Sequence, residues 1–319
     1  MTQVWILGNF FQNWKDLDKH YQYFMLRQEF EKNGCSVKFI NTPDLIIRNN
    51  SKYIEYQNEL LEAPDIAVIK TFMTGIYWKE KMRKLQSLGT FILNDPENMI
   101  EYSDKIKMYK RLNDVGVPIP KTMGIDCNSS FDDILSVAEK IGWPCIIKPN
   151  YGWSTAGVFP CRHSNDIKNA LANMQISLDD RMGKNRPKPT SYVIQELIDA
   201  KYMIVIVNAG KEKLHSTLLY GRHSYLQDTT YKNSPLFNIF NKHRMILEYQ
   251  LPSEAKDIFL KALDALGLDF VRGEMFATED GYKICELNGS GAYGTTSITC
   301  RENIAKNIVA HIMNRYNTR

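Results

Sequence analysis

The stretch from Val271 to Asn288 constrains the fold more than any other part of this chain. It reads VRGEMFATEDGYKICELN, two β-prone runs separated by Glu279-Asp280-Gly281. A three-residue loop with glycine at the left-handed position is a favoured connection between antiparallel strands. The pattern therefore predicts a β-hairpin in which Thr278 lies opposite Tyr282.

The same register places Glu274 directly opposite Glu286, with Asn288 on the same face because side chains alternate along a strand. Two carboxylates that face each other across a ladder repel and destabilise the pair. A hard cation reverses that effect, and two carboxylates with an amide oxygen suit Mg²⁺, usually together with substrate phosphates. The hairpin is therefore a candidate metal site. The alternatives are a solvated charged hairpin, or a two-residue Asp-Gly turn that shifts the register and separates the carboxylates.

The composition is that of an ordinary globular protein, since the 319 residues are 44% hydrophobic and 24% charged. A chain of this length buries a large core and is expected to divide into two or three domains. The formal net charge of +4 is too small to indicate nucleic-acid binding, and it suits an anionic small substrate such as a nucleotide.

The six cysteines are scattered and form no CxxC pair, which is typical of reduced cytosolic thiols rather than of a disulfide framework or zinc site. The apolar run near the N-terminus is too short for a signal peptide and lacks preceding basic residues. No run approaches the roughly 18 apolar residues of a membrane span. These observations predict a cytoplasmic protein.

Residues 1–95 alternate strand and helix patterns, which predicts βαβ units and a parallel sheet. In chain order, the expected elements are strand 4–7, helix 17–32, strand 36–41, strand 66–69, helix 77–88 and strand 90–94. This region contains no GxGxxG motif, so a dinucleotide site is not indicated.

A second region covers residues 96–190. A helical passage at 95–115 ends in GVPIP at 116–120, because proline disfavours helix at the preceding residue. From 121 to about 172 the pattern predicts strand, helix, strand, loop, strand and helix. The polar, proline-containing stretch 177–191 is expected to be a mobile loop.

The third region, 191–319, is expected to hold an antiparallel sheet. Its strands are expected at 193–198, 203–207, 214–219, 271–278 and 282–288. The last helix is marked by an apolar stripe at i+4 spacing, formed by Ile304, Ile308, Ile312 and Tyr316. The fold class is therefore α/β in the first region and α+β in the other two.

An apolar strand ending in Lys148 precedes the small-residue loop NYGWSTAGV at 150–158. A strand, a glycine loop and a second strand can wrap backbone N–H groups around phosphate, and the lysine adds a point charge. The motif is not a Walker A loop because the lysine precedes the glycines, and many ordinary hairpins look similar. The strand at 193–198 can present backbone groups to an adenine edge, although most such strands are core. Lys105, in the helical passage, is by itself typical of a solvated helix lysine.

The chain carries five motifs in order: Asp104-Lys105, Ile147-Lys148-Pro149 with its glycine and serine loop, Val193–Ile198, Glu274, and Glu286-Leu287-Asn288. In this order and spacing they resemble the ATP-grasp superfamily, and within it the RimK-like carboxylate–amine ligases. The resemblance covers nearly the whole chain. It implies an ATP-grasp fold in which a parallel α/β domain (1–95) precedes a central lid subdomain (96–190) and a C-terminal subdomain with the metal and substrate site (191–319).

The resemblance also implies roles for individual residues. The residues implied to bind ATP are Lys105, Lys148, Tyr151, Gly152, Trp153, Ser154, Thr155, Gly157, Gln195, Glu196, Leu197, Ile198 and Asp199. The implied metal ligands, for Mg²⁺ or Mn²⁺ in its place, are Glu274, Glu286 and Asn288. Lys148 and Arg222 are the implied catalytic residues, and the loop at 224–244 is implied to read the substrates.

One departure concerns the residues just after the adenine strand. RimK-like ligases commonly carry an acidic residue, one spacer and an arginine there, whereas this chain has Tyr202-Met203-Ile204. Asp199 is a candidate for the acidic ribose contact, and Arg222 or Arg244 for the arginine.

The implied reaction joins a carboxylate to an amine. The carboxylate attacks the γ-phosphate of ATP to give an acyl phosphate and ADP, and the amine then displaces phosphate to form an amide. The expected partners are small amino acids or peptides, without nucleic acid or membrane, and a homo-oligomer is compatible with the resemblance. The alternatives are a nucleotide-binding regulatory protein of ATP-grasp fold without ligase activity, and a ligase that modifies a peptide or protein tail.

Overall fold

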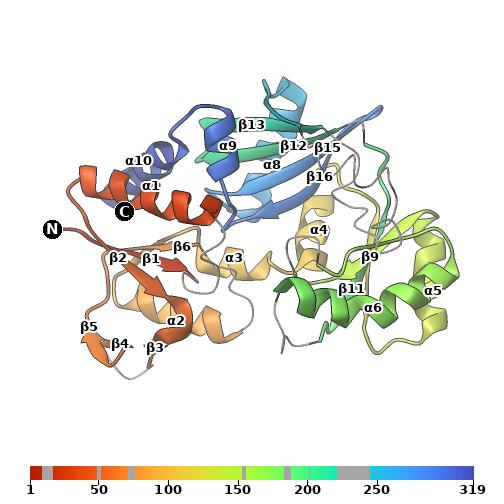
Figure 1. The fold of residues 1–319 in the computed structure, drawn as a ribbon, viewed down its shortest axis with the longest axis horizontal. Helices are drawn as coiled ribbons and strands as arrows, with labels where there is room; N and C mark the ends of the chain where they lie inside the picture. The colour runs from red at the N-terminus through yellow and green to blue at the C-terminus, as the bar shows by residue number, and fades with distance from the viewer. Residues whose placement is uncertain are drawn as a thin grey trace.

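The computed structural model describes residues 1–8, 17–48, 52–70, 76–152, 156–182, 188–200, 202–220 and 245–319 of the chain. Within these residues the chain forms three sheet-based parts (Figure 1). The mixed α/β and α+β character predicted from the sequence is confirmed. In the same part of the chain, no helix combines the length and hydropathy needed to cross a membrane.

The N-terminal part is built on a parallel sheet with strand order β2-β1-β6-β7, which confirms the predicted βαβ pattern. Its elements are β1 (Gln3–Gly8), α1 (Leu17–Lys32), β2 (Ser36–Asn41), β6 (Ile66–Ile69), α2 (Ile76–Ser87) and β7 (Phe91–Leu93). A small antiparallel sheet that the sequence did not predict lies between β2 and β6 in the chain. It consists of β3 (Leu45–Ile47), β4 (Ile54–Tyr56) and β5 (Glu59–Leu61).

The helical passage after β7 is divided into two helices, α3 (Pro96–Glu101) and α4 (Lys105–Asp114), rather than being continuous. The carboxylate of Asp104 accepts a hydrogen bond from the backbone N–H of Lys107, which is the usual way to begin a helix. This cap places Lys105 in the first turn of α4. In Figure 1 these two helices run from the N-terminal part towards the central one.

The central part is an antiparallel sheet with strand order β10-β9-β11-β8. Its elements are β8 (Thr122–Asp126), α5 (Phe131–Ile141), β9 (Cys145–Pro149), β10 (Phe159–Cys161), α6 (Ser164–Met182) and β11 (Ser191–Glu196). The strand expected at 193–198 was therefore assigned to the wrong sheet, because β11 pairs with β8 and β9. Alternation along a strand identifies its buried face, but it does not identify its neighbours.

The loop expected at 177–191 is also partly wrong, since α6 continues to Met182. Leu178 extends the apolar stripe that includes Ile167 and Met174, and all three are buried in the core of the central part. Burial of this stripe stabilises the extra helical turn despite its polar neighbours. Residues 183–187 of the expected loop lie outside the described residues.

The C-terminal part holds an antiparallel sheet with strand order β14-β13-β12-β15-β16. Its elements are β12 (Tyr202–Ala209), β13 (Lys213–Tyr220), β14 (Met245–Glu248), α8 (Ser253–Leu266), β15 (Arg272–Thr278), β16 (Gly281–Asn288), α9 (Gly294–Thr299) and α10 (Ile304–Asn317). The predicted stripe of α10 buries Ile304, Ile308 and Ile312 in one core with Leu26 and Phe30 of α1. The first and last parts of the chain therefore share a hydrophobic core.

Candidate functional site: a nucleotide and metal site

The hairpin of β15 and β16 places Glu274 opposite Glu286, as predicted, but it reaches this register by a different route. Thr278 lies opposite Gly281 rather than Tyr282, so the turn is one residue tighter than expected. A β-bulge next to Glu274 leaves Cys285 as an extra residue on β16. The bulge offsets the tighter turn and restores the pairing of the two carboxylates.

The carboxylates lie beside an arginine that the sequence reasoning missed. The guanidinium of Arg272 donates a hydrogen bond to Glu274, and Asn288 is the residue opposite Arg272 in the ladder. The side chains of Glu274 and Glu286 are 16% and 33% exposed, so a solvated charged hairpin is not what forms. Two carboxylates and an amide oxygen are a donor set that fits a hard divalent cation. In the described ranges, no group of three or more His, Cys, Asp and Glu side chains forms a metal site.

The side chain of Lys105, on α4, contacts the loop after β9 and lies close to β16. Its ammonium donates a hydrogen bond of 2.7 Å to the carbonyl of Gly152, and it lies 3.9 Å from a carboxylate oxygen of Glu286. Burial lowers the pKa of Lys105, Glu286 acts in the opposite direction, and Lys148 lowers it further. Lys105, which by itself is typical of a solvated helix lysine, is therefore a partly buried lysine beside the carboxylate of Glu286.

Lys148 forms the centre of a buried network behind the hairpin. Its ammonium donates to the hydroxyl of Tyr109 at 3.2 Å and to the amide oxygen of Gln195 at 2.9 Å. The Tyr109 hydroxyl in turn donates to the carbonyl of Cys285, the bulge residue. Burial lowers the pKa of Lys148, whereas Cys285, Glu286 and Glu274 raise it.

The loop after β9 contacts the start of α4. The hydroxyl of Tyr151 donates to the carboxylate of Asp104 at 3.0 Å, and burial together with this carboxylate raises the pKa of Tyr151 to about 12. Gly157 has a φ of +70°, and a Cβ there would lie 2.7 Å from the sulfur of Met174. Only glycine fits this turn without displacing its neighbours.

The end of β11 is occupied by contacts that the sequence did not predict. Gln195 is buried, and besides holding Lys148 it donates to the hydroxyl of Thr122 at 2.8 Å. The Glu196 carboxylate accepts from Lys283 at 2.7 Å and from the backbone N–H of Lys121 at 2.9 Å. Burial raises the pKa of Glu196, but the two hydrogen bonds outweigh it and the pKa is lowered.

Three more of the predicted ATP-binding residues, Leu197, Ile198 and Asp199, directly follow β11. The backbone N–H of Leu197 donates to the carbonyl of Pro144 at 3.2 Å. Ile198 is half-buried, and Asp199 is exposed. Trp153, Ser154, Thr155, Arg222, Arg244 and the loop at 224–244 lie outside the described residues.

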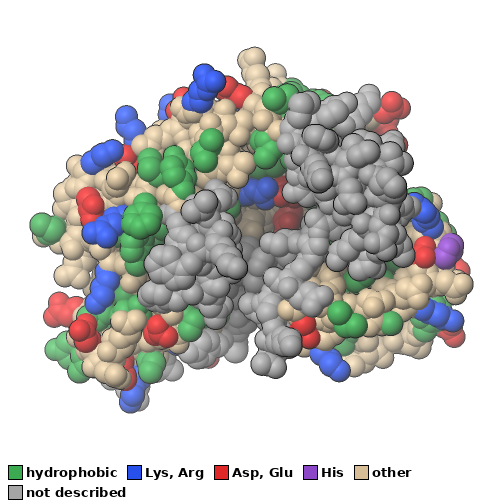
Figure 2. Space-filling view, in the orientation of Figure 1, with side chains coloured by type: hydrophobic (Ala, Val, Ile, Leu, Met, Phe, Trp, Pro, Cys, Tyr) green, Lys and Arg blue, Asp and Glu red, His purple; other side chains and the backbone are tan. Residues whose placement is uncertain are grey.

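Two functional candidates could have been found from simple spacing. Arg272 is two residues before Glu274, and the alternation that grouped Glu286 with Asn288 also places it on the same face. Tyr109 is four residues after Lys105 on α4, a spacing that puts both side chains on one helix face. Figure 2 shows basic and acidic side chains close together near the middle of one face of the molecule.

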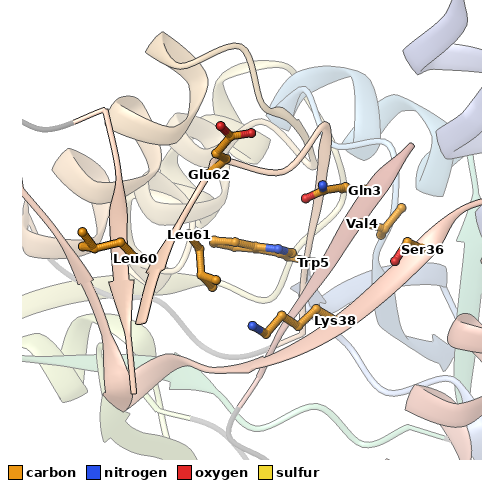
Figure 3. Close-up of a pocket in the computed structure, with 8 residues that line it drawn as sticks. All are labelled: Gln3, Val4, Trp5, Ser36, Lys38, Leu60, Leu61 and Glu62. Carbon is orange, nitrogen blue, oxygen red and sulfur yellow. The ribbon is translucent and has the colours of Figure 1, made fainter. Parts of the chain in front are cut away.

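A separate pocket of about 330 Å³ lies in the N-terminal part (Figure 3). It opens at the amino ends of β1 and β2, and the ring of Trp5 lies beside Leu61 in it. In open α/β sheets ligands bind at the carboxyl ends of the parallel strands, which is the opposite end. The pocket is therefore not part of the site described above.

Comparison with protein families gives a match for residues 104–184 to the carbamoyl-phosphate synthase L chain, ATP binding domain. The N-acetylaspartylglutamate synthase A of Mus musculus is 20% identical over 266 residues, which cover 81% of this chain and 63% of that protein. A probable alpha-L-glutamate ligase of Halorhodospira halophila is 22% identical over 259 residues, covering 80% of this chain and 78% of that protein. The chain thus spans less than two thirds of the length of the mouse synthase.

Solved structures match over nearly the whole chain. A RimK domain ATP-grasp protein from Sphaerobacter thermophilus has a TM-score of 0.68 at 14% identity, over 98% of this chain and 100% of that one. The ATP-grasp ligase PsnB, in complex with a variant of its minimal precursor, Mg and ADP, has a TM-score of 0.64 at 12% identity, over 98% of each chain. The chain therefore has the ATP-grasp fold, which it shares with a RimK domain protein and with the ligase PsnB.

Proposed function

We propose that this protein is an ATP-dependent ligase that joins a carboxylate to an amine through an acyl phosphate, with release of ADP and phosphate. The proposal rests on a cluster of charged side chains where the central and C-terminal sheets approach. Three basic side chains lie near two carboxylates there, and the cluster consists of Lys105, Lys148, Arg272, Glu274 and Glu286. Three cations beside two carboxylates suit a substrate that carries several phosphate charges together with a divalent cation.

Each charged group has a distinct task in this proposal. Lys105 and Lys148 are held in fixed positions by Gly152, Tyr109 and Gln195, so they can neutralise phosphate oxygens without reorganising. Arg272 is a further candidate for the role that the sequence suggested for Arg222, because a guanidinium can bind phosphate oxygens in a bidentate manner. No covalent protein nucleophile is required.

Glu274, Glu286 and Asn288 would hold Mg²⁺, with Mn²⁺ as a substitute. The bound ion supplies charge neutralisation on the phosphate oxygens. The chain's own residues then orient the nucleotide and exclude water, which protects a reactive acyl phosphate from hydrolysis.

The substrate class is an amino acid or a peptide, and the site operates in the cytoplasm. Two curated relatives carry names that describe the joining of glutamate, which supports an amino acid as one of the partners. A second structure of PsnB, in complex with the precursor peptide PsnA2, supports the second option, in which the acceptor is part of a longer chain.

The stoichiometry of the products tests the reaction class. With ATP, Mg²⁺ and a mixture of amino acids, ADP and inorganic phosphate should appear in equal amounts. Hydroxylamine added without an amine should trap the acyl phosphate as a hydroxamate. Formation of AMP and pyrophosphate would contradict the proposal, and nucleotide binding without any turnover would favour a regulatory protein instead.

A further inference from the structure

The turn that follows Asn288 is held from outside its own sheet by two buried residues of the N-terminal part. Lys70 follows β6, and its ammonium donates to the carbonyl of Gly291 at 2.7 Å and that of Ser290 at 3.3 Å. Asn94 follows β7, and its amide donates to the carbonyl of Gly289 at 3.0 Å. The parallel sheet therefore contacts three consecutive residues of this turn from the carboxyl ends of two strands.

The turn is in direct contact with the side chains of the proposed metal and phosphate site. The amide oxygen of Asn288 accepts hydrogen bonds of 3.1 Å from both the backbone N–H and the hydroxyl of Ser290. The backbone N–H of Gly291 donates to the carbonyl of Asn288 at 3.1 Å. A Cβ at Gly291 would overlap the Cβ of Arg272, so the turn also packs against the base of the arginine. A shift of the turn would therefore move both the amide and the guanidinium.

Lys70 is a rigid anchor for this turn. Its ammonium lies 5.0 Å from the ring centre of Phe270 and 5.1 Å from that of Tyr293, and the residue is 8% exposed. A buried cation is costly unless acceptors and aromatic faces offset the lost hydration. Because moving the ammonium would lose these contacts together, the carbonyl of Gly291 is held in one place.

We propose that Lys70 is a positioning residue for the metal ligand Asn288, and that it acts through the Gly289–Gly291 turn. The inference rests on the proposed function, because it requires a divalent cation at Glu274, Glu286 and Asn288. Residues that orient metal ligands contribute to metal affinity. Their loss typically weakens metal binding by about 10–100-fold. The competing explanation is that Lys70 only fastens the N-terminal part to the C-terminal sheet.

The chain offers a matched control for this test. Lys81, on α2 of the same N-terminal part, is also a buried lysine, donates to the carbonyl of Leu45 at 2.8 Å, and lies 5.4 Å from the ring centre of Trp78. Its contacts are with the small antiparallel sheet rather than with the turn. Lys70→Met and Lys81→Met therefore remove the same kind of interaction, but only the first touches the path to Asn288.

The measurement is Mn²⁺ affinity in the presence of saturating ADP, read from the free Mn²⁺ signal in electron paramagnetic resonance. We expect Lys70→Met to weaken Mn²⁺ binding by about tenfold and Lys81→Met to leave it unchanged. ADP affinity without metal should stay the same in Lys81→Met. Equal Mn²⁺ affinity in Lys70→Met and the unaltered protein, or an equal loss in both variants, would overturn the proposal.

A second variant tests the same path from its other end if Lys70→Met does not fold. Ser290→Ala removes one of the two hydrogen bonds to the Asn288 amide oxygen, and a loss of about threefold is expected because the backbone bond remains. Unchanged Mn²⁺ affinity in Ser290→Ala would then overturn the proposal. If the proposed metal site does not exist, the result is different: the unaltered protein and Glu286→Gln then bind Mn²⁺ equally.

Discussion

Glu274 and Glu286 lie opposite each other on β15 and β16, directly beside the bulge at Cys285. Each has a cation of its own, since Arg272 bonds to Glu274 and Lys105 lies 3.9 Å from Glu286. Two facing carboxylates are tolerated in this ladder because positive charge approaches from both sides. The pair therefore has a structural explanation before any ligand binds, and a divalent cation would strengthen an arrangement that already exists.

The first prediction concerns the proposed metal ligand Glu286. Glu286→Gln keeps the size of the side chain but removes its charge, so Mg²⁺ binding and ADP formation should be lost while the fold is retained. Glu279→Gln, at the exposed turn of the same hairpin, is the matched control and should remain active. Turnover by Glu286→Gln at saturating Mg²⁺ would rule out this residue as a ligand.

The second prediction concerns Lys148. Lys148→Met removes a charged donor from the phosphates, and ADP binding should weaken by about 1.5–3 kcal/mol. Isothermal titration calorimetry gives the affinity, and Lys168→Met, an exposed lysine on α6, provides the control. Unchanged ADP affinity together with normal turnover would remove Lys148 from the site.

The third prediction is a pH dependence that follows from burial. Burial lowers the pKa of Lys148, so its ammonium loses a proton below the ordinary lysine value of about 10.4. The charged form binds phosphate. ADP affinity should therefore be highest below the lowered pKa of Lys148 and fall as the pH rises through it. Lys148→Arg stays charged and should lose less affinity over the same alkaline range. An identical alkaline loss in both proteins would contradict this assignment.

The free energy of unfolding should change in the opposite direction over that window. Between the lowered pKa and the ordinary value, the unfolded chain binds more protons at this lysine than the folded chain does. Stability therefore rises with pH in that interval. Urea titrations of the unaltered protein and Lys148→Met at several alkaline pH values measure the difference, and parallel curves would show that Lys148 does not contribute.

The fourth prediction concerns the buried network behind the hairpin. Tyr109→Phe removes the hydroxyl that accepts from Lys148 and donates to the carbonyl of Cys285. Leaving buried groups unsatisfied should lower the free energy of unfolding by about 1–3 kcal/mol. Tyr53→Phe, at an exposed tyrosine, should change it little. Urea denaturation compares the two, and an equal effect of both substitutions would argue against the network.

The sequence by itself determined most of the helices and strands and the pairing of the two carboxylates. Alternation and turn residues are local signals, and they were sufficient for the βαβ pattern, the stripe of α10 and the presence of a hairpin at Val271–Asn288. The predicted loop of that hairpin was wrong, yet Glu274 still lies opposite Glu286 because the bulge at Cys285 compensates for the tighter turn.

Only the tertiary structure decided which segments meet. β11 pairs with β8 and β9 rather than with the C-terminal strands, and Lys105 reaches Glu286 across 181 positions of the chain. Lys70 likewise lies at the turn after Asn288, which no local pattern indicates. The physical reason is that strand order and long-range contacts depend on how whole faces pack together, and side-chain spacing within one segment carries no information about its partner.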